Sequence, residues 1–310
     1  MGQIVITEYM EAAAIERLNA AYTTLYDPDL GTAPDRLRAA VAGARALIVR
    51  NRTQVDDALL AAAPGLKVLG RLGVGLYNID LEACRIRQVE VIPAAGANAD
   101  SVAEYTVLSV GMLLRGVFQD SATIAAGQWP RERLSGGREM GGKTLGILGF
   151  GDIGRRVARL ARAFGMRVIA HDPVLPIDHS GWAENATKSV TLDELVARSD
   201  AITLHVPLEA TTRSLVDATL LAAMKPGAVL VNASRGGVVV EADLAAALRA
   251  GQLGGAVLDV FEVEPLPADS PLIGAPNLVL TPHIAGATRE SNLRVSSLIA
   301  ARVLVALAMD

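Results

Sequence analysis

Short apolar runs alternate with segments of helical periodicity along the chain, which is typical of an α/β protein. From residue 142 onward we predict six buried strands, namely Leu145–Leu148, Arg167–His171, Ala201–Val206, Ala228–Asn232, Ala256–Val260 and Leu278–Thr281. Helices lie between them: one begins with the capping box Thr191-x-x-Glu194, and another runs from Glu241 to Ala250 and ends at Gly251. Strands separated by helices predict a doubly wound parallel sheet.

The first third of the chain repeats this alternation. We predict strands near Ile4–Ile6, Ala46–Val49, Val68–Leu72 and Val89–Ile92. This part has no glycine-rich phosphate loop of its own, so it predicts a second, smaller α/β domain. The segment 177–188 lacks periodicity and is expected to be a surface loop.

A helix from Ser101 to about Phe118 is apolar on nearly every side, so we expect it to be buried between domains or against another subunit. The last helix, about Thr288 to Met309, follows the final strand and is expected to complete the first domain. We therefore predict a substrate domain of residues 1–97 with 286–310 and a nucleotide-binding domain of residues 98–285.

Gly149, Gly151 and Gly154 form a G-x-G-x-x-G motif between a strand and a helix, and Asp172 ends the next strand. The glycine motif alone is weak evidence, but this context is that of a dinucleotide-binding loop. The glycines allow a tight turn, close approach of a pyrophosphate and close helix packing, while the helix N-terminus supplies N–H groups. Asp172 can accept hydrogen bonds from both ribose hydroxyls, and its charge would repel a 2′-phosphate. The sequence therefore predicts NAD rather than NADP.

Polar side chains follow the last three predicted strands: Arg235, Glu264 and His283. Each alone could be a surface charge or a satisfied core histidine, but together, beside a dinucleotide site, they favour catalysis. Histidine titrates in the neutral range and suits the base that takes a hydroxyl proton. Glu264 would fix its tautomer, and Arg235 offers a planar fork for a carboxylate. The pattern predicts hydride transfer between NAD and a 2-hydroxy or 2-oxo acid.

These motifs resemble the D-isomer-specific 2-hydroxyacid dehydrogenase family, in its phosphoglycerate-dehydrogenase-like branch. The resemblance covers nearly the whole chain and rests on the phosphate loop and on Gly73–Asp80, Asn232–Gly236, Leu258–Phe261 with Glu264-Pro265, and Thr281–Gly286. It implies a Rossmann NAD domain and a smaller flavodoxin-like substrate domain, with Arg235, Glu264 and His283 as the catalytic set. It also implies a homodimer built on the helix at 101–118.

The resemblance further implies a carboxylate pocket from the backbone of Val74 and Gly75. It also implies nicotinamide contacts from Asp259, Ala233 and Gly286. The full set of cofactor-binding residues expected is Gly149, Gly151, Asp152, Ile153, Gly154, Asp172, His205, Val206, Pro207, Ala233, Ser234, Arg235, Asp259, His283 and Gly286. Tyr77 is a departure, because family members commonly carry aspartate at this position, close to the carboxylate loop.

Arg50 and Arg52 follow the strand that ends at Val49, so they also lie on a ligand-facing edge. One substrate carboxylate does not require two arginines, so the pair indicates a substrate with a second anionic group. A pair of solvated surface arginines fits the sequence equally well. In the phosphoglycerate branch the arginine matching Arg50 meets the substrate's distal anion. The resemblance therefore favours 3-phosphoglycerate or sulfolactate, and the run Leu47–Gln54 looks like the sulfolactate subgroup.

Three other functions stay open. The chain could be a broad-specificity dehydrogenase of glycerate and lactate, or a non-enzymatic NAD sensor similar to the corepressors of this fold. A relative that acts on formate or phosphite is the third, but formate dehydrogenases of this superfamily pair their histidine with glutamine, and Glu264 argues against it.

Composition narrows the class of protein. The 310 residues suffice for two domains, 51% of them are apolar, and the net charge of −4 gives no reason to expect nucleic acid or an anionic membrane as partner. No basic region precedes the first strand, and the apolar segment Val102–Leu114 is shorter than a bilayer span. A single cysteine, Cys84, excludes an internal disulfide. We expect a soluble cytoplasmic enzyme without a metal site.

Overall fold

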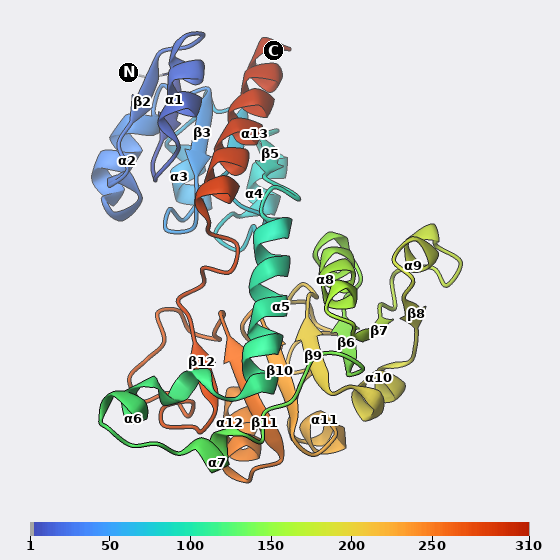
Figure 1. Ribbon diagram of the computed structural model, residues 1–310. Helices are drawn as coiled ribbons and strands as arrows, with labels where there is room; N and C mark the ends of the chain where they lie inside the picture. The colour runs from blue at the N-terminus through green and yellow to red at the C-terminus, as the bar shows by residue number, and fades with distance from the viewer. Residues whose placement is uncertain (1–2, 310) are drawn as a thin grey trace. The chain divides into compact units, whose positions relative to one another are not determined.

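The structure is a computed structural model that describes residues 3–309 (Figure 1). It divides the chain into two compact units, Met1–Asn98 with Ala287–Asp310, and Ala99–Gly286. Each boundary lies one residue from the one expected from the sequence. We call them the first unit and the second unit.

The first unit contains a five-stranded parallel sheet in the order β2-β1-β3-β4-β5. Its strands are β1 Ile4–Ile6, β2 Thr24–Tyr26, β3 Ala46–Val49, β4 Val68–Arg71 and β5 Glu90–Pro93. This is the flavodoxin-like doubly wound order, so the fold predicted for this part is confirmed. The edge strand β2 was not predicted because its residues are exposed or half-buried and give no apolar run.

The helices of the first unit cover this sheet: α1 Ala12–Asn19, α2 Pro34–Val41, α3 Asp57–Ala61, α4 Leu81–Ile86 and α13 Arg289–Ala308. By length and hydropathy alone α13 could span a membrane, and no other helix within residues 3–309 could. Ile299 and Val303 of α13 are fully buried, and a β-carbon at Gly70 of β4 would lie 2.7 Å from Ile299. Packing against the sheet therefore accounts for the buried apolar residues of α13.

The second unit contains a seven-stranded parallel sheet in the order β12-β11-β10-β9-β6-β7-β8. Its strands are β6 Thr144–Leu148, β7 Arg167–His171, β8 Lys188–Ser189, β9 Ala201–Leu204, β10 Ala228–Asn232, β11 Leu253–Leu258 and β12 Leu278–Leu280. Six of these were predicted, and the doubly wound Rossmann-type sheet is confirmed. The order reverses between β6 and β9, which is where ligands bind in sheets of this kind.

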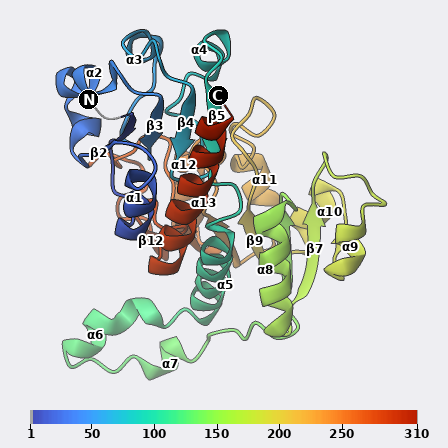
Figure 2. The same ribbon diagram turned by 90° about the horizontal axis from the view of Figure 1, so that it is seen from above.

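The helices of the second unit are α5 Ala99–Arg115, α6 Ser121–Ala125, α7 Arg131–Leu134, α8 Asp152–Ala163, α9 Ser180–Glu184, α10 Leu192–Arg198, α11 Ala218–Ala223 and α12 Glu241–Arg249. The long helix α5 packs beside α8 and against β10 and β11. Beyond the end of α5, α6 and α7 lie well away from the sheet (Figure 2). The predicted cap of α10 is present, since Thr191 Oγ1 accepts from the Glu194 N–H at 3.2 Å.

The segment 177–188 corrects one expectation from the sequence. It is not a plain surface loop, because it contains α9 and the start of β8. Trp182 of α9 is buried and stacks on Phe150 with a centroid distance of 4.6 Å. Trp182 is thus the residue that holds this segment against the rest of the unit. A single buried residue gives no periodic pattern of apolar positions, so the sequence did not predict the helix.

Candidate active site

The glycine-rich loop after β6 lies at the reversal of the seven-stranded sheet. Gly149 has φ = 92°, and a β-carbon there would lie 2.8 Å from the backbone of His205, after β9. A β-carbon at Gly154 would lie 2.3 Å from the carbonyl oxygen of Gly149. A β-carbon at Gly151 would meet nothing within 4 Å. Two glycines are thus needed for backbone packing, while the third leaves open space at the N-terminus of α8, which fits a pyrophosphate.

Asp172 lies directly after β7 and holds this loop. Its carboxylate accepts the backbone N–H of Phe150 at 2.8 Å and those of Val174 and Leu175 at 3.0 and 3.2 Å. A carboxylate has about four acceptor positions, so three backbone donors leave room for one more. The ribose contact of Asp172 stays a prediction.

His205 provides a second observation that fits a cofactor. Its Nε2 lies 3.2 Å from Thr203 Oγ1, whereas its inaccessible Nδ1 has no hydrogen-bond partner within residues 3–309. Burial lowers the pKa of the His205 imidazole to about 3, so the ring is neutral at physiological pH. A buried nitrogen without a protein partner, beside Gly149, suits a polar group of a dinucleotide. Val206 and Pro207 continue from this position.

Arg235 follows β10 in a turn held by Asn232. The buried Asn232 side chain donates to the Arg235 carbonyl at 2.9 Å and accepts from Ser234 N–H and Oγ at 3.0 and 2.8 Å. The half-buried Arg235 donates to the carbonyl of Ser234. Ala233 lies in the same turn, which therefore presents Arg235 at the carboxyl end of the sheet.

His283 lies in the loop after β12, and the buried Asp259 organises that loop. The Asp259 carboxylate accepts from Thr281 Oγ1 at 2.6 Å and from the N–H groups of Ile284 and Ala285 at 2.8 and 2.7 Å. His283 has φ = 55°, a conformation that costs a side-chain-bearing residue about 1 kcal/mol or more. The bonds to Asp259 hold the loop in this conformation, and a nicotinamide contact by Asp259 stays a prediction.

Glu264 and His283 meet directly, as the sequence predicted. His283 Nδ1 lies 2.8 Å from Glu264 Oε2, while Glu264 Oε1 accepts the Phe261 N–H at 3.1 Å. An ionised carboxylate can only accept, so this contact places the ring hydrogen on Nδ1 and leaves Nε2 for proton exchange. Both side chains are about one-third exposed, so a substrate can reach them.

The Arg235 turn packs tightly against the Glu264 loop. A β-carbon at Gly236 would lie 1.8 Å from the carbonyl oxygen of Phe261. The absence of a side chain at Gly236 thus lets the two loops touch through their backbones. The structure thereby gathers Arg235, Glu264 and His283 at the carboxyl edge of β10, β11 and β12.

Comparison with known proteins agrees with this geometry. Residues 107–285 match the family model of the D-isomer specific 2-hydroxyacid dehydrogenase, NAD binding domain. The chain is 50% identical to an (S)-sulfolactate dehydrogenase of Chromohalobacter salexigens over 296 residues, which are 96% of this chain and 95% of that relative. The chain belongs to the D-isomer specific 2-hydroxyacid dehydrogenase family. It is therefore an NAD-dependent oxidoreductase.

Two further relatives of this dehydrogenase are informative. It is 40% identical to a D-3-phosphoglycerate dehydrogenase of Archaeoglobus fulgidus over 255 residues, which are 82% of this chain but 48% of that relative. The chain thus spans about half the length of that protein. A D-lactate dehydrogenase of Aquifex aeolicus, solved with NAD and lactic acid, superposes with a TM-score of 0.84 at 28% identity, covering 99% of this chain and 96% of that one.

The first unit of the dehydrogenase carries the two arginines predicted to meet the substrate. Arg50 Nη2 donates to Asn292 Oδ1 of α13 at 2.9 Å. Arg52 Nη2 donates to the Pro28 carbonyl at 2.8 Å, and its Nε lies 3.5 Å from the carboxylate of Glu8. A neutral amide therefore holds Arg50, whereas Arg52 lies beside a negative charge.

The loop with Val74 and Gly75 follows β4, and Val74 is exposed. Arg71, the last residue of β4, is buried under this loop, and its guanidinium lies 5.7 Å from the ring centre of Tyr77. Tyr77 thus contacts a cation at the position where relatives were expected to carry aspartate. Sequence reasoning missed both Arg71 and Glu8, although a charge at the end of an apolar strand was a visible signal.

Within residues 3–309, no group of three or more histidine, cysteine, aspartate or glutamate side chains could hold a metal ion.

Proposed function

We propose that this dehydrogenase oxidises 2-hydroxy acids that carry a second anionic group, with sulfolactate as the first candidate and 3-phosphoglycerate as the second. The observation that supports this proposal concerns Arg50, whose guanidinium is held by the neutral amide of Asn292 and, within residues 3–309, by no carboxylate. Its charge is thus free to meet an anion. The 50% identity to an (S)-sulfolactate dehydrogenase supports the same substrate class.

We propose roles for the catalytic residues of the second unit that fit their contacts. Arg235 binds the C1 carboxylate through a planar two-pronged contact. His283 Nε2 takes the proton of the C2 hydroxyl as the C2 hydride leaves, and Glu264 holds Nδ1 so that Nε2 faces the substrate. NAD supplies the hydride acceptor. The loop after β6, with Asp172 and His205, holds the dinucleotide.

A panel of 2-hydroxy acids with NAD, followed by absorbance of the reduced cofactor, tests this proposal. Hydrogen bonds to charged groups contribute about 1.5–3 kcal/mol, so sulfolactate or 3-phosphoglycerate should exceed lactate and glycerate roughly ten- to a hundredfold in kcat/KM. Arg50→Ala should erase most of this preference. Arg52→Ala is the matched control and should keep more of it, because Glu8 already compensates that charge. Equal rates with lactate and sulfolactate would support the broad-specificity alternative instead.

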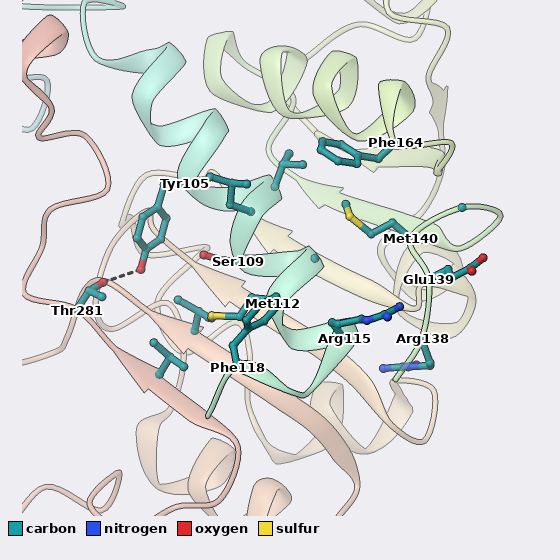
Figure 3. A pocket seen from close by; sticks show the side chains of 16 residues that line it. Tyr105, Ser109, Met112, Arg115, Phe118, Arg138, Glu139, Met140, Phe164 and Thr281 are labelled. Atoms are coloured by element: carbon teal, nitrogen blue, oxygen red, sulfur yellow. Dashed lines mark hydrogen bonds between the residues drawn. The ribbon is translucent and has the colours of Figure 1, made fainter. Parts of the chain in front are cut away.

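A homodimer through α5 is the second part of the proposal. An apolar groove of about 830 Å³ runs along α5 in the second unit, lined by Tyr105, Met112, Phe118 and Phe164 among others (Figure 3). Leu108 in its wall is 66% exposed, and Phe118 is 61% exposed. Apolar patches of this kind mark protein interfaces, and a second copy of the chain would cover it.

Light scattering after gel filtration tests the dimer. Leu108→Arg should yield monomers, whereas Ile177→Arg, an exposed apolar residue outside the groove, should leave the dimer intact. An unchanged mass for Leu108→Arg would place the interface elsewhere.

A cytoplasmic location without a membrane or nucleic-acid partner completes the proposal. The net charge of −4 and the buried free thiol of Cys84, whose pKa is raised by burial, support a reducing compartment and a small-molecule substrate. Cell fractionation with an antibody tests it, and recovery in the membrane fraction would contradict it.

A further inference from the structure

The loop that carries Arg50 and Arg52 wraps around one buried carboxylate. Glu8, two residues after β1, is 1% exposed. Its Oε1 accepts the backbone N–H groups of Arg50 and Thr53 at 2.9 and 3.0 Å. Its Oε2 accepts those of Asn51 and Arg52 at 3.2 and 3.0 Å. Four consecutive backbone donors therefore converge on a single side chain.

This arrangement requires the charge of Glu8. Burial alone would raise the pKa of Glu8, but the N–H groups of Thr53, Arg52 and Arg50 outweigh burial and lower it below its ordinary value. The carboxylate is thus ionised at physiological pH. Successive backbone N–H groups of this kind form anion-binding concavities in other proteins. Here the chain fills the concavity with its own anion, so the N–H groups fix the loop and do not bind substrate.

The other side of the loop is fixed as well. Asn78 Nδ2 donates to the carbonyls of Thr53 and Arg50 at 2.7 and 3.3 Å, and the hydroxyls of Thr7 and Thr53 lie 2.7 Å apart. With its N–H and carbonyl groups both bound, the loop backbone cannot turn. The direction of the Arg50 side chain then depends on its contact with Asn292.

We infer that Glu8 is a positioning residue that sets where Arg50 meets the second anionic group of the substrate. Glu8 does not touch the substrate. It holds the backbone from which Arg50 extends. Its carboxylate also lies 3.5 Å from Arg52 Nε and partly compensates the charge of Arg52, whereas the guanidinium of Arg50 binds a neutral amide. This inference rests on the proposed function.

Glu8→Gln tests it with little change in size. Either oxygen that becomes an NH₂ group must face two backbone N–H donors, so at least two hydrogen bonds are lost and the loop must shift. We expect KM for sulfolactate or 3-phosphoglycerate to rise about tenfold or more, as for loss of one charged contact. KM for lactate and kcat with either substrate should stay within about threefold of wild type, a change of at most about 0.65 kcal/mol.

Two further variants serve as a control and as a charge-preserving substitution. Glu16→Gln, an exposed glutamate of α1 in the same unit, is the matched control and should leave all constants unchanged. Glu8→Asp keeps the charge but shortens the side chain, so it should give a smaller rise in the same KM and serves if Glu8→Gln folds poorly. Amide hydrogen exchange of residues 50–53 should quicken in both Glu8 variants.

The outcomes separate the two proposals. If wild type shows no preference for the doubly anionic acids, the proposed substrate class is wrong and the role of Glu8 falls with it. If wild type shows the preference but the Glu8 variants keep it, or raise KM for lactate equally, Glu8 is structural and the inference is overturned while the proposed function stands.

Discussion

Gly236→Ala is the sharpest test of how the catalytic set is assembled. A β-carbon at Gly236 would lie 1.8 Å from the Phe261 carbonyl oxygen and 2.0 Å from its carbonyl carbon, whereas real β-carbons essentially never approach below 3.0 Å. The two loops must therefore separate by about 1.2 Å. Both clashing groups are backbone, so no side-chain rotation can relieve the contact.

The size of the effect follows from what the two loops carry. Arg235 immediately precedes the substituted residue, and Glu264 lies three residues after Phe261. A misplacement of about 1 Å can reduce turnover about a hundredfold. We therefore expect kcat to fall about a hundredfold. NAD affinity should fall much less, because Gly149, Gly151 and Asp172 are untouched although the displaced loop also carries Ala233 and Ser234.

Steady-state kinetics at saturating NAD and substrate measure kcat, and titration calorimetry measures NAD affinity. Gly254→Ala, at the opposite end of β11, is the control: its β-carbon would lie 2.5 Å from the Gly227 carbonyl oxygen, again a backbone contact. It should lower Tm yet retain kcat near wild type. Wild-type kcat in Gly236→Ala, or an equal loss in the control, would refute the reasoning.

Three further predictions concern single side chains. His283→Gln should lower kcat about 10²–10⁴-fold with NAD affinity kept, and kinetics with calorimetry check it. Arg235→Lys keeps the charge but loses the two-pronged contact, so kcat/KM for every 2-hydroxy acid should fall about tenfold or more. The lowered pKa of His205, about 3 against an ordinary 6.5, means that the unfolded chain binds this proton first as pH falls. The free energy of unfolding should decline from about pH 6.5 downward, by at most about 1.4 kcal/mol per pH unit, and urea titrations should show a flatter decline in His205→Asn.

Much of the fold could be predicted because parallel strands buried on both faces read as apolar runs. The strands that escaped prediction, β2 and β8, are short edge strands with exposed or half-buried residues. Trp182 shows the same limit for helices, since α9 is five residues long and is anchored by one ring. These elements depend on single contacts that leave no pattern in the sequence.

The meeting of Glu264 and His283 could be predicted for a different reason. Carboxyl ends of parallel strands share one edge, so polar residues that follow neighbouring strands come together. The sequence could not predict the backbone contact of Gly236 with Phe261, because this contact depends on the path of two loops. The sequence contains the glycine, but nothing in it indicates that Phe261 is the residue that the glycine contacts.

Three buried or partly buried carboxylates show what holds the functional loops. Glu8 follows β1 and binds the loop after β3, Asp172 follows β7 and binds the loop after β6, and Asp259 follows β11 and binds the loop after β12. In each case the carboxylate binds N–H groups after the strand that pairs with its own.

These donors lie 22 to 45 residues from their acceptors along the chain, so no local motif reveals them. The physical need is general: loops after parallel strands leave backbone N–H groups without ladder partners, and buried donors must be satisfied. An acidic residue directly after a buried parallel strand is therefore a candidate holder of the neighbouring loop. In this chain the sequence predicts ligand contacts for Asp172 and Asp259, and their bonds to backbone N–H groups give each a loop-holding role as well.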